Sequence, residues 1–87
     1  MGDRDHSIVL IGPTHLPQID DKAHRLEVDG VPHIAIFKLT SETGTQVVRV
    51  VQLFETDREG DDLRAAPGDA TLLHQVASAL SEYWRTA

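Results

Sequence analysis

Two residues in the first half of the chain, Asp29 and Gly30, constrain its fold more than any others. They stand between the β-prone segments HRLEV and VPHIAIFKLT. A two-residue hairpin turn needs positive φ at both central positions, and Asp followed by Gly is one of the pairs that accept this backbone. The sequence therefore predicts an antiparallel hairpin in which Val28 faces Val31.

The neighbouring segments extend this hairpin into a meander. Residues 46–54 (QVVRVVQLF) form another β-prone run, and the loop SETGT at 41–45 connects it to the hairpin. Residues 7–12 (SIVLIG) are predicted to form a further short strand, which Gly12 and Pro13 end. We expect an antiparallel sheet of three or four strands. The strand order and the register across 41–45 stay open.

The C-terminal part of the chain predicts one amphipathic helix. Asp69 is a suitable N-cap residue, and helical periodicity runs from Ala70 to Thr86. Apolar side chains fill one side of this helix over an arc of roughly 160°. They are Leu72, Leu73, Val76, Ala77, Ala79, Leu80, Tyr83 and Trp84. Such a helix needs an apolar surface to lie on, so the predicted fold class is α+β, with the helix packed on one face of the sheet.

The predicted sheet carries more apolar side chains than one helix can cover. Ile34 to Phe37 are all apolar, so both faces of that strand need a cover. A helix about 10 Å wide covers one face. The second cover is either residues 7–22 or another copy of the chain, and we favour the second copy. The surface predicted for this contact consists of Ile34, Ile36, Val48, Val50 and Val51.

Length and composition limit the domain organisation. The chain has 87 residues, of which 25% are charged, and this predicts a single small folded domain. Residues 1–6 are polar and are expected to be loose. Residues 55–68 (ETDREGDDLRAAPG) are acidic and contain two glycines and a proline. They are expected to form a mobile loop.

The charge of the chain argues against direct binding of nucleic acid. Fourteen Asp and Glu residues stand against eight Lys and Arg residues, for a formal net charge of −6. Binding to a phosphate backbone needs clustered Lys and Arg instead. The same charge permits docking to a basic protein. The predicted acidic docking residues are Asp57, Glu59, Asp61 and Asp62.

The location of the protein is inferred from what the sequence lacks. It contains no cysteine, which excludes disulfides and thiolate metal sites. Its longest uninterrupted apolar run, from Ile8 to Ile11, is far shorter than the roughly 20 residues that span a bilayer. We therefore expect a cytoplasmic protein that does not bind membranes.

A pair of histidines is the candidate for a metal site. In the predicted hairpin, His24 and His33 are diagonal neighbours on one face of adjacent strands. A stable metal site needs more than two ligands, and no further His, Asp or Glu residue follows a sequence spacing that is typical of a metal site. The pair is kept as a candidate, and no metal or other cofactor is predicted.

The sequence predicts no enzyme activity. It contains neither a phosphate-binding glycine loop nor a G-x-S-x-G motif, and no catalytic residue is assigned. The leading hypothesis is a small non-catalytic protein-interaction module that acts as a homodimer. One alternative is a small-ligand or metal-binding protein that uses His24 and His33. The other is an acidic nucleic-acid mimic or inhibitor that binds a basic protein.

Overall fold

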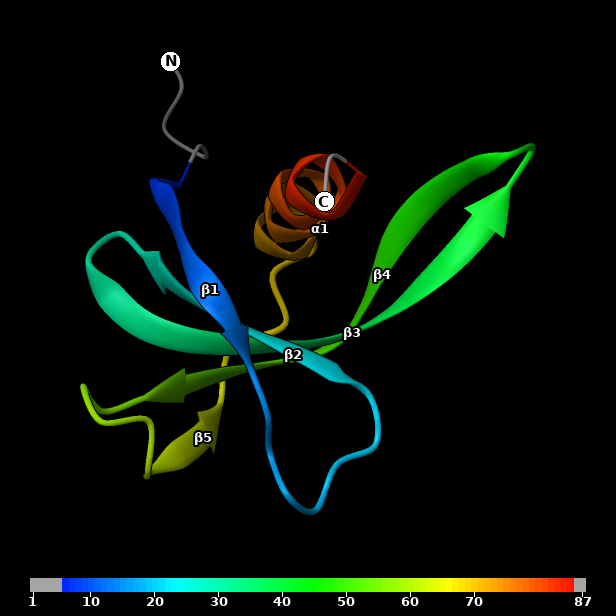
Figure 1. Ribbon diagram of the computed structural model, residues 1–87. Coiled ribbons are helices and arrows are strands. Elements are labelled where there is room, and N and C mark those ends of the chain that lie inside the picture. The colour runs from blue at the N-terminus through cyan, green and yellow to red at the C-terminus, as the bar shows by residue number, and fades with distance from the viewer. Residues whose placement is uncertain (1–5, 86–87) are drawn as a thin grey trace.

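The computed structural model describes residues 6–85 as an antiparallel five-stranded sheet with one helix packed on it (Figure 1). The strands are β1 (Ile8–Thr14), β2 (Lys22–Val28), β3 (Val31–Glu42), β4 (Thr45–Thr56) and β5 (Leu63–Ala65), and the helix is α1 (Ala70–Arg85). The spatial order β1-β2-β3-β4-β5 follows the chain, so the sheet is a meander, and it curls strongly. The predicted α+β class is confirmed, with one strand more than expected.

A tight turn joins β2 to β3 as the sequence predicts. Asp29 and Gly30 have φ angles of 52° and 83°. Positive φ at both central residues defines a type I′ turn, which matches the twist of the paired strands. Val28 pairs with Val31 across it. The Asp-Gly hairpin is therefore confirmed.

The connection between β3 and β4 is shorter than the expected five-residue loop. Glu42 pairs with Thr45, so the turn contains only Thr43 and Gly44. These two residues have φ angles of 49° and 81°, which is again a type I′ geometry. The strands thus continue to the turn, and the tip of this hairpin projects away from the rest of the molecule (Figure 1).

A β-bulge explains the doubled valines of β4. The register between β3 and β4 shifts between Ile36 and Phe37, and Val51 is left as the extra residue on β4. Residues an odd number of positions apart lie on opposite faces of a regular strand. Val48 and Leu53 are five positions apart, yet both lie in the core that contacts α1. The bulge therefore places apolar residues from both halves of β4 under the helix.

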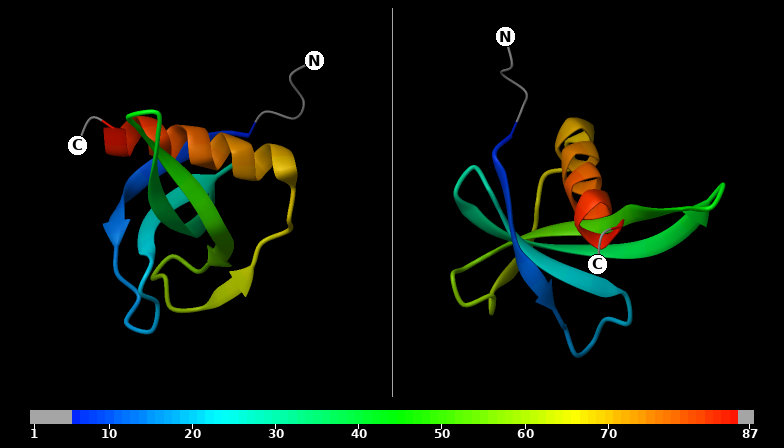
Figure 2. Two further views of the ribbon diagram at one scale, coloured as in Figure 1. Left: turned by 90° about the vertical axis from the view of Figure 1, so that its right-hand side faces the viewer. Right: turned by 45° about the horizontal axis from the view of Figure 1, so that its top comes forward.

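Helix α1 lies across one side of the curled sheet (Figure 2). It begins where the carboxylate of Asp69 accepts a hydrogen bond of 3.0 Å from the backbone N–H of Thr71, which confirms the predicted N-cap. Its buried side chains are Leu72, Val76 and Leu80. They share one core with the sheet residues Leu26, Val28, Ala35, Phe37, Val48 and Leu53.

A second, smaller core fills the opposite face of the sheet. Ala23, Ile34 and Ile36 are buried there. The partly buried residues that cover them are Leu16, Ile19, Phe54 and Leu63. Leu16 and Ile19 belong to the connection between β1 and β2, and Leu63 belongs to β5. The chain itself therefore covers the face that we expected a second subunit to cover.

The acidic segment 55–68 has more regular structure than expected. Its first two residues end β4, and Leu63–Ala65 form β5, which pairs with β4. The segment that connects β4 to β5 is thus limited to residues 57–62, the acidic loop. Strand β5 leaves no periodic signal in the sequence, because it contains only three residues.

The predicted loose N-terminus falls mostly on residues 1–5, which lie outside the described residues. His6 is described, and its ring Nδ1 lies 2.8 Å from a carboxylate oxygen of Asp29. The backbone N–H of Ser7 donates to the same carboxylate at 2.9 Å. These contacts hold the start of β1 against the β2–β3 turn.

Candidate functional site

The residues predicted as a subunit interface do not form one exposed surface. Ile34, Ile36 and Val48 are buried within the single chain, with at most 3% of their surface exposed. Val50 is half-buried against the main core, whereas Val51 is 52% exposed at the bulge. The β1–β2 connection and β5 cover the two isoleucines, and α1 covers Val48. These three residues are therefore not accessible to a partner in this structure.

The two histidines of the candidate metal site lie on one face, as expected. His33 pairs with Leu26, two residues from His24, so the two rings are diagonal neighbours. Both side chains are buried, and the Nδ1–H of His33 donates to the carbonyl oxygen of Val31 at 2.8 Å. Within residues 6–85, no group of three or more His, Cys, Asp or Glu residues is placed to hold a metal.

His24 lies in the contact between the sheet and the end of α1. The indole N–H of Trp84 donates to its Nδ1 at 3.3 Å, and the rings of Tyr83 and Trp84 meet it edge-on at centroid distances of 4.8 and 6.1 Å. The Lys22 ammonium lies over the ring of Trp84, 5.5 Å from its centre. Burial lowers the pKa of His24. His24 is therefore a neutral anchor for the end of the helix.

This environment makes the stability of the fold depend on pH. Below pH 6.5, the ordinary pKa of His24, the unfolded chain takes up a proton that the folded chain does not, so the free energy of unfolding should fall as the pH drops below that value. Denaturant titrations from pH 8 to pH 5 would measure this slope. His24→Gln, which cannot titrate, should flatten it. An equal slope in His24→Gln would contradict the assignment.

His6 requires a separate control in that experiment. Its hydrogen bond to Asp29 raises the pKa of His6. The stability gained from this contact is present below pH 6.5 and is lost as the pH rises through the raised pKa, which is opposite in sign to the effect of His24. Measuring the slope in a His6→Gln background removes this contribution.

Asp57 organises the acidic loop. Its carboxylate accepts hydrogen bonds from the backbone N–H groups of Asp61 at 2.8 Å and Asp62 at 3.5 Å, and its carbonyl oxygen accepts one from Gly60 at 3.1 Å. The bonds to the carboxylate, the one from Asp61 above all, hold the pKa of Asp57 below its ordinary value. All four predicted acidic docking residues are exposed on this loop. Asp57 has a structural role there, whereas no hydrogen bond or ion pair within residues 6–85 engages the carboxylates of Glu59, Asp61 and Asp62.

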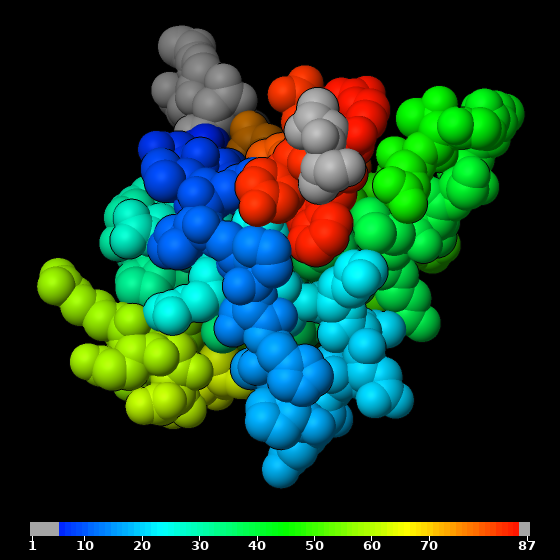
Figure 3. All heavy atoms as spheres, viewed as in Figure 1, coloured from blue at the N-terminus to red at the C-terminus, as the bar shows by residue number. Residues whose placement is uncertain are grey.

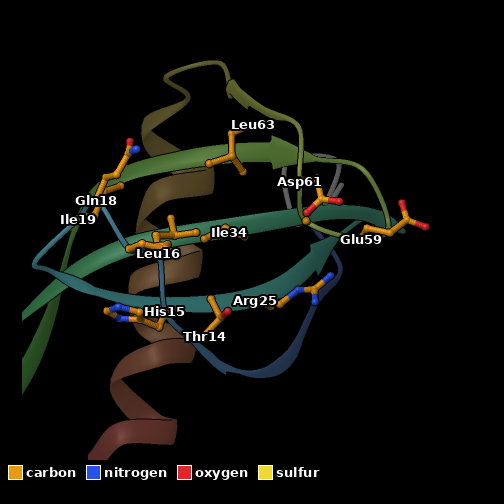
Figure 4. Close-up of a pocket in the computed structure, with 12 residues that line it drawn as sticks. Thr14, His15, Leu16, Gln18, Ile19, Arg25, Ile34, Glu59, Asp61 and Leu63 are labelled. Carbon is orange, nitrogen blue, oxygen red and sulfur yellow. The ribbon is translucent and has the colours of Figure 1, made fainter.

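A hollow of about 470 Å³ lies on the sheet face opposite the helix (Figure 4). Its walls come from the β1–β2 connection, from β2 and β3, and from the acidic loop with β5. Leu16, Ile19, Ile34 and Leu63 give it an apolar part, whereas Arg25, Glu59 and Asp61 lie together at its other end. The sequence did not reveal this site, because segments that are distant in the sequence form it.

The outer edge of β1 is a second exposed feature. The strand order places β1 at one edge of the sheet. Val9 and Ile11 on this strand are 53% and 57% exposed. The four consecutive apolar residues Ile8 to Ile11 are therefore not all covered. In the structure the side chains of β1 alternate between half-buried and exposed.

Comparison with known proteins assigns no family. No protein-family model matches the chain, and searches of curated proteins and of solved structures found no match. Among the described residues, no helix combines the length and apolar character needed to cross a membrane. The surfaces described above are the basis for the proposals that follow.

Proposed function

We propose that this chain is a small non-catalytic protein-interaction module that acts as a homodimer, and that its subunits meet along the outer edge of β1. The exposure of Val9 and Ile11 on an edge strand carries the proposal. An edge strand offers unpaired N–H and C=O groups to another strand. In the space-filling view, the blue side chains of β1 lie at the surface with no other element over them (Figure 3).

The composition of β1 favours a second copy as the partner. Its sequence, IVLIGPT, contains no charged residue, although edge strands that stay unpaired are commonly protected by charged side chains. An antiparallel pair of identical strands brings the same residues of both subunits together, as two-fold symmetry requires. Residues 8–14 contain none of the Asp and Glu residues that give the chain its net charge of −6. Two uncharged edges can therefore approach without direct repulsion.

The length of the usable edge sets the expected strength of this dimer. The register of β1 shifts between Leu10 and Gly12, and Pro13 has no N–H to donate. Pairing is thus limited to residues 7–11. So short a contact buries less than the roughly 1,200 Å² of a typical stable interface. We expect a dimer that dissociates on dilution.

Light scattering after size exclusion, over a range of concentrations, tests the proposal. The wild-type mass should rise from the monomer value of 9.6 kDa toward twice that value. Val9→Lys and Ile11→Lys should stay folded and monomeric, because each places a charge on the edge. Val51→Lys is the matched control, since Val51 is equally exposed but lies on an interior strand. A monomeric wild type, or equal loss of dimer in Val51→Lys, would contradict the proposal.

Several expectations from the sequence remain predictions. They are the non-catalytic character, the cytoplasmic location and the alternative of a metal or small-ligand site at His24 and His33. Saturable zinc binding that His33→Ala abolishes would favour the last of these over the interaction module.

A further inference from the structure

We propose that the hollow on the second face of the sheet binds a small carboxylic acid with an apolar chain, such as a medium-chain fatty acid, whose carboxylate is held by Arg25. Residues 7–11, which form the proposed dimer edge, do not line this hollow. The inference therefore goes beyond the proposed interaction role and does not depend on it. It assigns a class of small-molecule ligand to a surface that is separate from that edge.

Arg25 is partly buried on this face and has no carboxylate partner. Within residues 6–85 its guanidinium group makes one hydrogen bond, from Nη2 to the carbonyl oxygen of Arg58 at 2.9 Å, and no ion pair. Its Nε is buried and has no acceptor among these residues. Its Nη1 has no acceptor there either and stays accessible. A guanidinium group in this state favours an added acceptor, because its planar donors match the two oxygens of a carboxylate.

Thr14 brings a second donor next to Arg25. Arg25 pairs with Gly12 on the adjacent strand, and Thr14 lies two residues further along, so Thr14 and Arg25 are diagonal neighbours on one face. Both residues line the hollow, and Figure 4 shows them side by side. Each carboxylate oxygen accepts more than one hydrogen bond. A carboxylate bound by Arg25 can therefore also accept one from the hydroxyl group of Thr14.

The rest of the hollow fits a hydrocarbon chain. Ile34 is buried at its floor, and Leu16 and Leu63 line it from either side (Figure 4). Its volume of about 470 Å³ lies within the range of roughly 300–1,000 Å³ that is usual for ligand sites. Such sites combine mostly apolar walls with a few polar groups that fix the orientation of the ligand. Here Arg25 and Thr14 would fix the charged end of the acid.

The acidic residues of the lining leave Arg25 available to an anion. Glu59 and Asp61 line the hollow, but neither forms an ion pair with Arg25. In Figure 4 the carboxylate of Glu59 is directed away from the hollow. Repulsion by the more distant acidic residues is screened over about 8 Å at physiological ionic strength. A single guanidinium group suits the single charge of a carboxylate better than the double charge of a phosphate group.

A fatty acid is a better source of the carboxylate than the C-terminus of a peptide. A peptide would bring its backbone N–H and C=O groups against Leu16, Ile34 and Leu63, whose side chains offer no hydrogen bond. Burying such groups without partners is unfavourable, whereas burying methylene groups is favourable. A tripeptide with a free C-terminus, acetyl-Ala-Leu-Leu, should therefore bind more weakly than octanoate.

Titration of the ¹⁵N-labelled full chain with sodium octanoate in the millimolar range tests this inference at physiological ionic strength. We expect saturable shifts of amide signals around the hollow, and binding at least about five-fold tighter than that of 1-octanol, which lacks the charge. Arg25→Gln should weaken octanoate binding about ten-fold and leave 1-octanol binding unchanged. Arg49→Gln removes the same charge from an exposed position outside the hollow. It should change the affinity for octanoate less than about two-fold.

Asp61→Asn gives a test that keeps Arg25 in place. Removal of the negative charge at Asp61 should strengthen octanoate binding about two-fold, because one repulsive charge leaves the lining. It should not change the binding of 1-octanol. If Arg25→Gln also lost 1-octanol binding, the hollow itself would have changed in that variant, and the result for Asp61→Asn would decide.

The opposite results would overturn the inference. Absence of saturable shifts with octanoate, or equal binding of octanoate and 1-octanol to the wild type, would show that the hollow does not select a carboxylate. Equal weakening in Arg25→Gln and Arg49→Gln would indicate unspecific attraction. Weaker or unchanged octanoate binding in Asp61→Asn would place the carboxylate outside the hollow. Tighter binding of the tripeptide than of octanoate would assign the hollow to a peptide C-terminus.

Discussion

Replacement of Phe37 by alanine is expected to lower the free energy of unfolding by about 3–5 kcal/mol. Among residues 6–85, Phe37 is the largest fully buried side chain, and it lies in the main core between the sheet and α1. Its ring contacts Trp84 at a centroid distance of 5.5 Å, so the truncation also loosens the end of the helix. A small domain has a total stability of about 5–15 kcal/mol, so this variant should be close to unfolding.

Denaturant unfolding, followed by circular dichroism and by the fluorescence of Trp84, measures this loss. Phe54→Ala is the matched control, because it removes the same group from a half-buried position on the opposite face. Its cost should be clearly smaller. Equal costs for the two variants would mean that the core under α1 does not dominate the stability of the fold.

Replacement of Ile36 by glutamate is expected to unfold the chain, with a loss of more than about 4 kcal/mol. Ile36 is 3% exposed in the second core, beneath residues of the β1–β2 connection and β5. A carboxylate there would lose its hydration without a partner for its charge, which the fold cannot tolerate. This expectation differs from that for an interface residue, whose replacement would give a folded monomer.

Val51→Glu provides the comparison for that experiment. Val51 is near Ile36 in the sheet but is 52% exposed at the bulge, so a carboxylate at this position stays in water. Its circular dichroism spectrum and unfolding midpoint should match those of the wild type. If Ile36→Glu were instead folded and monomeric while the wild type is a dimer, the second sheet face would be the subunit interface.

The elements that local sequence determines were predictable. The turn at Asp29 and Gly30 depends on backbone preferences of two residues. The start of α1 depends on one side chain, Asp69, which accepts a hydrogen bond two residues ahead. The apolar side of the helix follows from its period, and Leu72, Val76 and Leu80 on that side are buried.

Features that depend on pairing between distant strands were not predictable. The bulge at Val51 fixes which valines of β4 face the helix, and it arises only when β4 pairs with β3. Strand β5 is three residues long and exists as a strand because β4 offers it hydrogen bonds. Neither leaves a periodic signal in the sequence.

The candidate sites also divide into features that local sequence indicated and features that depend on contacts between distant segments. The turn alone placed His24 and His33 on one face, and composition alone marked the acidic loop. The sequence could not place the acidic loop beside Leu16, nor leave Val9 exposed, because both depend on where segments far apart in the chain meet. The interface assigned to Ile34 and Ile36 failed to form an exposed surface for the same reason.

By itself, the sequence determined the meander, the helix and the excess of apolar side chains over what one helix covers, because turn preferences and side-chain periods act over a few residues. Only the tertiary structure decided what covers the second face. Burial is a collective property of the whole chain, and the β1–β2 connection with β5 gains enough apolar contact over Ile34 and Ile36 to close that face without a partner. The hollow and the open edge of β1 are what remains exposed after that closure.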